Sequence, residues 1–107
     1  MDSKPVVKHS ALDKFKHDIT SGRITYIIKG FTNLVNLIEP MKYFEWGEDV
    51  SVENLQEGFT NVFESTFDSP EGWDAYLTHP THLECGNELL STLEKILFIY
   101  YKPSCII

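Results

Sequence analysis

The spacing of apolar residues changes along this 107-residue chain from every second residue to helical spacing, and then back again. Residues 6–15 and 59–67 alternate in polarity, which is typical of β-strands with one buried face. Between them, apolar residues recur at intervals of three and four from Ile24 to Val35, and Pro40 ends this pattern. A chain that alternates strand and helix in this way is expected to pack helices on a β-sheet.

The remaining segments complete the expected set of elements. Ser69 followed by Pro70 is typical of a helix start, and the spacing of Thr81 and Glu84 matches a capping box at the start of another helix. We expect strands over residues 6–15, 41–46, 59–67 and 96–101, helices over residues 20–39, 70–79 and 81–95, and an acidic connection over residues 48–58.

This order predicts an α+β ferredoxin-like fold, βαββαβ, with a four-stranded antiparallel sheet and helices on one face. At 107 residues the chain has room for one domain, with its core over about residues 6–103. The other face of the sheet would be markedly apolar, because it carries Leu12, Val62, Leu97, Ile99 and Tyr101. An open apolar face of this size predicts a homodimer in which two sheets pack together.

Charge and composition exclude several classes of partner. The formal net charge of −7 repels phosphate backbones, so we expect no nucleic acid partner. No apolar run approaches the roughly 20 residues that span a bilayer, so we expect no membrane partner. Cys85 and Cys105 make no disulfide framework and residues 1–5 lack a signal-peptide core, which together favour a cytoplasmic location.

Polar residues fall on the expected core face of two strands: His9, Asp13, Asn61 and Ser65. A buried carboxylate without a partner is costly, so Asp13 is the most unusual of these residues. Two interpretations remain open. Asp13 lines a cavity that contains water, or the strand ends before it and leaves it at the rim beside Lys14 or Lys16.

His82 and Tyr76 are candidates for acid–base chemistry. At the first position of a helix, His82 faces unpaired N–H groups that disfavour imidazolium, so a neutral ring is expected there. A neutral imidazole in a cavity can act as a general base, and Tyr76 can donate a hydrogen bond to an oxyanion. The alternative is a locally capping histidine and an ordinary core tyrosine. A zinc site at His79 and His82 has little support, because Pro80 separates them and no third ligand has suitable spacing.

Short motifs follow one another in a characteristic order: Val7-Lys8-His9, residues 33–42, Trp46-Gly47, Gly58-Phe59-Thr60, residues 63–67, and Tyr76 to His82 with the pattern Tyr-x-x-His-Pro-x-His. Over Val6 to Pro103 this series resembles the plant stress-responsive A/B barrel (Dabb) family. It is most similar to the heat-stable antimicrobial type and is also similar to the polyketide cyclases of that family.

The resemblance implies a dimeric α/β barrel with a cavity between the sheet and the helices. In the cyclase members, the residues at Tyr76 and His82 form the catalytic pair, and we add Asp13 as a further acid–base group or an orienting partner of His9. The expected substrate is a small apolar carbonyl compound, which needs no organic cofactor. The expected substrate-binding residues are His9, Ala11, Ile27, Ile28, Phe31, Asn61, Phe63, Ser65 and His79. Backbone carbonyls of Val35, Ile38 and Met41 are implied to hold a structural Mg²⁺.

Three positions depart from the family pattern. Asn61 stands where a cavity histidine is usual, Tyr100 where an aspartate is usual, and Asp13 where the residue is ordinarily apolar. The cavity of this chain is therefore expected to differ from that of the cyclases. We expect a cyclase of specialised metabolism with lyase or isomerase chemistry. The alternatives are a non-catalytic, heat-stable defence protein and a binder of a small apolar ligand.

Overall fold

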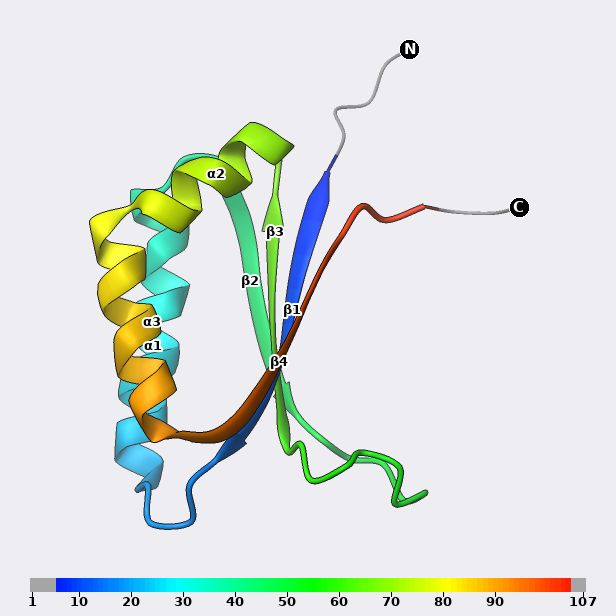
Figure 1. Cartoon of the computed structure of the whole chain (residues 1–107). Helices are drawn as coiled ribbons and strands as arrows, with labels where there is room; N and C mark the ends of the chain where they lie inside the picture. Colours follow the sequence, from blue (N-terminus) through cyan, green and yellow to red (C-terminus); the bar gives the residue numbers. More distant parts are fainter. Residues whose placement is uncertain (1–5, 105–107) are drawn as a thin grey trace.

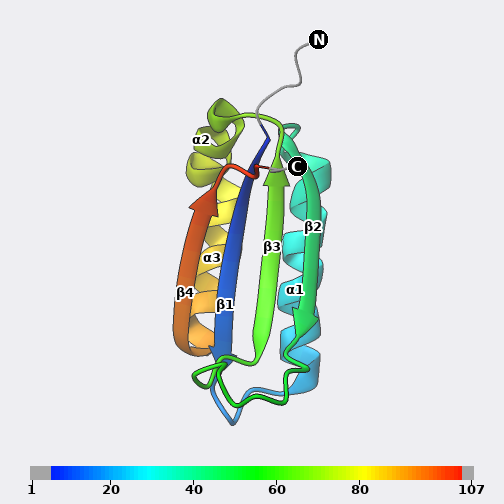
Figure 2. The ribbon, with the colours of Figure 1, turned by 90° about the vertical axis from the view of Figure 1, so that its right-hand side faces the viewer.

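The computed structural model describes residues 6–104, which form one four-stranded antiparallel sheet covered on one face by three helices (Figure 1). The elements are β1 (Val7–Phe15), α1 (Ser21–Leu37), β2 (Met41–Glu48), β3 (Asn61–Phe67), α2 (Pro70–Thr78), α3 (Pro80–Thr92) and β4 (Leu93–Tyr101). The strand order is β2-β3-β1-β4, so β2 and β4 are the edges (Figure 2). The expected ferredoxin-like fold is confirmed. Cys105 lies outside the described residues.

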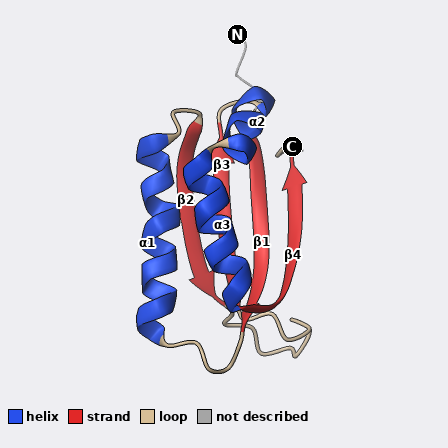
Figure 3. Ribbon diagram, turned by 60° about the vertical axis from the view of Figure 1, so that its left-hand side comes forward, coloured by secondary structure: helices blue, strands red, loops and turns tan. Residues whose placement is uncertain are grey.

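The first helix has the cap and the buried side that its sequence predicts. The Thr20 side chain accepts a hydrogen bond from the Arg23 amide at 3.1 Å, which satisfies one of the free donors at the helix start. The buried side of α1 consists of Ile27, Ile28, Phe31 and Leu34. Helix α1 lies beside α3 on the same face of the sheet (Figure 3), so these residues belong to the single core between the two layers.

Two strand boundaries differ from the expected ones. β3 begins at Asn61 rather than at residue 59, because Gly58 has a φ of 83° and the Phe59 amide turns back to the Gln56 carbonyl. β4 begins at Leu93 rather than at residue 96. Leu93 pairs with Phe15 of β1, and this long-range strand pairing ends the helix earlier than the sequence predicts.

Two further details differ from the sequence interpretation. β2 continues to Glu48, because Gly47 and Glu48 pair with β3. The cap of α3 is His79 rather than Thr81, with the His79 Nδ1 accepting a hydrogen bond from the Thr81 amide at 3.2 Å. His82 is consequently the third residue of α3, still within the first turn where backbone N–H groups lack helical partners.

Within residues 6–104, no helix covers the sheet face opposite α1, α2 and α3 (Figure 1). On this face, Leu97 and Ile99 are about half exposed, and Leu12 and Val62 are only partly covered. The expected apolar outer face is thus present. Among the described residues, no helix has both the length and the apolar character needed to cross a membrane.

Candidate active site

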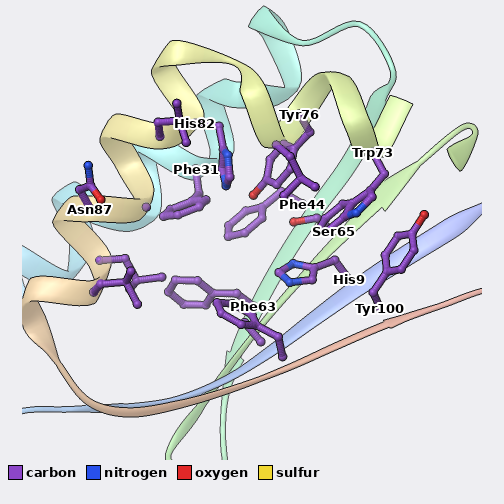
Figure 4. Close-up of a pocket in the computed structure, with 17 residues that line it drawn as sticks. His9, Phe31, Phe44, Phe63, Ser65, Trp73, Tyr76, His82, Asn87 and Tyr100 are labelled. Carbon is purple, nitrogen blue, oxygen red and sulfur yellow. The ribbon is translucent and has the colours of Figure 1, made fainter. Parts of the chain in front are cut away.

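A cavity of about 380 Å³ lies between the sheet and the helices (Figure 4). Much of its wall is aromatic, with Phe31, Phe44, Phe63, Trp73, Phe98 and Tyr100 among the lining residues. The polar side chains that reach it are His9, Ser65, Tyr76, His82, Asn87 and the hydroxyl-bearing Tyr100, and none of the described lining residues is Asp, Glu, Lys or Arg. The volume lies within the usual range for small-molecule sites, and the wall suits a largely apolar, uncharged ligand.

The break between α2 and α3 brings Tyr76 and His82 together. His79 ends α2 because the residue before a proline is disfavoured in helical conformation, and Pro80 then starts α3. The Tyr76 and His82 rings consequently face each other with their centroids 3.8 Å apart and their planes tilted by 32°. Tyr76 is buried and His82 is half-buried at the cavity wall.

The environment keeps both members of this pair neutral. Burial lowers the pKa of His82 below its ordinary value, although the nearby carbonyls of Leu77 and Tyr76 oppose the shift. Its Nδ1 is buried and has no hydrogen-bond partner among the described residues. Burial also raises the pKa of Tyr76 well above its ordinary value, with a polar contact from Ser65 acting in the other direction. At pH 7 the imidazole can accept a proton and the phenol can donate a hydrogen bond.

His9 is a second neutral imidazole in the cavity. Its ring lies between the Trp73 ring, with centroids 4.7 Å apart, and the Phe98 ring, at 5.0 Å. Burial lowers the pKa of His9 to about 4, and the neighbouring His82 acts in the same direction. The ring can therefore donate and accept hydrogen bonds at neutral pH without carrying charge.

Asp13 is fully buried but does not line the cavity. The interpretation that places it at the rim is wrong, because β1 continues to Phe15. Neither carboxyl oxygen has a hydrogen-bond partner in the described chain, and burial raises the pKa of Asp13 to about 7. On the same face of β1, Ala11 forms part of the cavity wall, so the carboxyl lies one strand repeat behind that wall.

The structure brings seven of the expected site residues to the cavity: His9, Ala11, Phe31, Phe63, Ser65, Tyr76 and His82. Other expected substrate-binding residues lie elsewhere. Ile27 and Ile28 belong to the packed core, and the His79 ring is used as a helix cap. Asn61 is at the end of the sheet beside Asp13, where its side-chain oxygen accepts a hydrogen bond from the Thr60 hydroxyl at 2.8 Å.

Several wall residues were not expected from the sequence. Alternation on β4 carries a signal for Phe98 and Tyr100, since the outward-facing Leu97 and Ile99 place both on the inner face. Trp73 has a weaker signal in its three-residue spacing from Tyr76 on α2. Leu83 and Leu90 of α3 are about half exposed at the cavity rim. Nothing in the sequence distinguishes Asn87.

The implied Mg²⁺ site falls at the turn between α1 and β2. Here the Ile38 carbonyl accepts the Met41 amide at 2.9 Å, which leaves one lone pair free. In the described part of the chain, no backbone amide donates to the Val35 carbonyl in the last turn of α1. Carbonyl oxygens at a helix C-terminus suit a hard cation that would hold this turn. The Mg²⁺ site stays a prediction.

A family model provides the deciding comparison. The model of the Stress responsive A/B Barrel Domain, Dabb, matches residues 7–103. The chain belongs to the Dabb family. This agrees with the motif order, the ferredoxin-like sheet and the inner cavity.

Two relatives of the chain have names that refer to different functions. The chain is 50% identical over 105 residues to the stress-response A/B barrel domain-containing protein HS1 of Arabidopsis thaliana, covering 98% of this chain and 96% of that protein. It is 41% identical over 97 residues to olivetolic acid cyclase of Cannabis sativa, covering 91% and 96%. This Dabb chain is therefore similar both to a stress-response protein and to an enzyme.

Solved structures extend the comparison. The hydroxynitrile lyase from Passiflora edulis superposes with a TM-score of 0.90 at 30% identity, covering 97% of this chain and 98% of that one. A dimeric ferredoxin-like protein of unknown function from Jannaschia superposes with a TM-score of 0.83 at 22% identity, covering 92% and 99%, a similarity that shows the fold alone.

Proposed function

We propose that this Dabb chain is a cofactor-independent cyclase or lyase that acts on a small, largely apolar carbonyl compound. The observation that carries the proposal is the Tyr76–His82 pair, with ring centroids 3.8 Å apart and both residues at the wall of an uncharged cavity. The similarity to olivetolic acid cyclase and to a hydroxynitrile lyase supports an enzyme of this class.

The chemistry follows from the protonation states. The neutral His82 imidazole removes a proton from the substrate, and the Tyr76 hydroxyl donates a hydrogen bond to the oxygen that gains negative charge. The resulting imidazolium then returns the proton to the product. Because the low-dielectric wall disfavours separated charges, imidazolium and oxyanion are expected to form and disappear together. His9 and Ser65 are placed to orient the substrate.

Asp13 has no direct part in this mechanism. Its carboxyl lies behind the cavity wall and would reach a substrate only if Ala11 and Phe63 moved aside. We therefore assign the acid–base steps to His82 and Tyr76 alone.

We further propose that the chain forms a homodimer through the outer sheet face. The half-exposed Leu97 and Ile99 support this arrangement, as does the likeness to a protein described as dimeric. Burying this face against a second sheet would remove Leu97 and Ile99 from water.

Kinetics of site variants test the proposed activity. The assay offers the purified protein carbonyl compounds of two kinds, apolar aldehydes together with cyanide and linear polyketide thioesters, and measures kcat/KM. We expect His82→Ala to lower kcat/KM by about 10²–10⁴-fold and Tyr76→Phe by about 10²–10³-fold, because each variant removes a group that acts in the transition state. Leu37→Ala, at an exposed position on α1, is the control and should match the parent. Unchanged turnover in folded His82→Ala would exclude the proposed base.

A second candidate is a non-catalytic stress or defence protein. The 50% identity to a stress-response protein over nearly the whole chain favours it. In that case, protective activity should survive Tyr76→Phe and fail when Leu97→Glu disrupts the outer face. If the chain acts as the proposed enzyme, its activity should instead fall in Tyr76→Phe.

A further inference from the structure

A stack of aromatic rings closes one end of the cavity. The Trp73 ring of α2 lies over the Tyr100 ring of β4, with centroids 4.5 Å apart and planes 23° apart. Figure 4 shows this pair beside His9, at the end of the cavity away from Asn87. The two rings connect a helix to the edge strand, so together they form a wall across this end.

Trp73 is held in place by its other neighbours. It stacks on Tyr76 at 5.5 Å, meets Phe67 edge-on at 5.4 Å and contacts His9 at 4.7 Å. These contacts fix the indole from the core side and leave Tyr100 as the ring on its outer side. Trp73 is therefore a rigid support for whatever closes the cavity here.

Tyr100 is the replaceable part of this wall. It pairs with His9 across β1 and β4, and β4 is an edge strand of the sheet in the described part of the chain. Its side chain is 42% exposed, and no hydrogen bond involves its hydroxyl in the described chain. Removing the ring would thus open the His9 end without leaving a buried polar group unpaired.

The opposite end of the cavity is less closed. Leu83 and Leu90 of α3 are each about half exposed where they line it. A ligand arm can project between these apolar side chains, whereas an arm that points toward His9 meets the stacked rings of Trp73 and Tyr100.

We propose that Tyr100 is a specificity-determining residue whose ring, stacked on Trp73, limits the length of the substrate arm on the His9 side of the reacting carbonyl. This inference rests on the proposed function for the position of the carbonyl, whose oxygen accepts from the Tyr76 hydroxyl beside His82. It assigns to Tyr100 a steric role, so its ring is required and its hydroxyl is not.

Symmetric dialkyl ketones test this directly, because one of their two equal arms must occupy the His9 end. We would titrate 3-pentanone, 4-heptanone, 5-nonanone and 6-undecanone into the parent protein, Tyr100→Ala and Tyr100→Phe by calorimetry. Each methylene that fits should strengthen binding about fourfold. We expect affinity to stop rising at a shorter arm in the parent and in Tyr100→Phe than in Tyr100→Ala.

Methyl ketones with one long arm provide the matched control. Their methyl group can occupy the His9 end while the long arm projects past Leu83 and Leu90, so all three proteins should bind the series alike. The same best arm length in Tyr100→Ala and the parent would overturn the proposal, as would a shift in Tyr100→Phe or no ketone binding at all. His82→Ala should keep the parental length preference, which separates this result from a failure of the proposed catalysis.

Discussion

At the scale of single residues, two buried titratable groups affect stability with opposite signs. Asp13 has a pKa of about 7 in the folded chain against an ordinary 3.8, so the folded state holds a proton that the unfolded state releases. The free energy of unfolding therefore falls as pH rises from about 4 to 7. His9, with a pKa of about 4 against 6.5, is unprotonated when folded, so its contribution falls as pH drops through the same range.

The Asp13→Asn substitution should show that the effects of Asp13 and His9 on the pH dependence of stability offset each other. The gain in unfolding free energy over the parent should be small at pH 4 and about 4 kcal/mol at pH 8, because only the parent must bury a carboxylate there. The variant should also lose stability on acidification below pH 6.5, since the opposing effect of Asp13 is gone. Urea unfolding at several pH values measures both effects. Asp18→Asn, at an exposed position, is the control, and an equal gain in that variant would contradict the account.

At the scale of residues, the sequence predicts which face of the sheet a side chain lies on but not where along the strands the cavity ends. Alternation correctly places His9, Asp13 and Ser65 on the inner face of the sheet. It does not show how far along the strands the cavity extends. The Phe63 side chain ends the cavity before Asp13 and Asn61, and that depends on packing from other elements.

At the scale of elements, the position of α2 is constrained by its close approach to the turn between α1 and β2. A Cβ added at Gly72 would lie 2.4 Å from the Pro40 Cβ and 3.2 Å from an Asp68 carboxyl oxygen. Because Pro40 is rigid, the helix would have to move, and α2 carries Tyr76.

Gly72→Ala should therefore lower the unfolding free energy by about 2 kcal/mol, as expected for overpacking. It should also weaken turnover by displacing Tyr76 from His82. Thermal unfolding and kcat/KM measure the two effects. Gly22→Ala, at a similar position in the first turn of α1, meets nothing within 4 Å and should be neutral or slightly stabilising. A stable, fully active Gly72→Ala protein would show that α2 is not held by this contact.

The break between α2 and α3 could be predicted from His79 and Pro80, because a residue before proline leaves the helical region. The identity of the cap could not. Thr81 with Glu84 has the better capping-box pattern, yet the His79 ring reaches the Thr81 amide because Pro80 already occupies the first helical position.

At the scale of the whole molecule, the outer sheet face determines assembly. Leu97→Glu places a carboxylate on the apolar outer face, where Leu97 of β4 pairs with Leu12 of β1, and pairing two such faces would bury charge without a partner. We expect the parent to be dimeric and this variant to be monomeric by light scattering at micromolar concentration. Leu37→Glu, at a similarly exposed position on α1, should leave the dimer intact. Dissociation in both variants, or in neither, would contradict assembly through the sheet.

The architecture could be predicted from the sequence because two alternating segments and one helical stripe leave few ways to bury their apolar faces. The cavity could be predicted only in outline. Its aromatic end depends on Trp73 and Tyr100, which lie on different elements and meet only after β4 pairs with β1.

The protonation state of His82 is the centre of the proposed mechanism. An NMR pH titration of the histidine ring signals, assigned with His82→Ala, measures its pKa in the folded protein. We expect a value below the ordinary 6.5, so that the ring is neutral and available as a base at pH 7. A His82 ring that is still protonated at pH 7 would contradict the proposed mechanism.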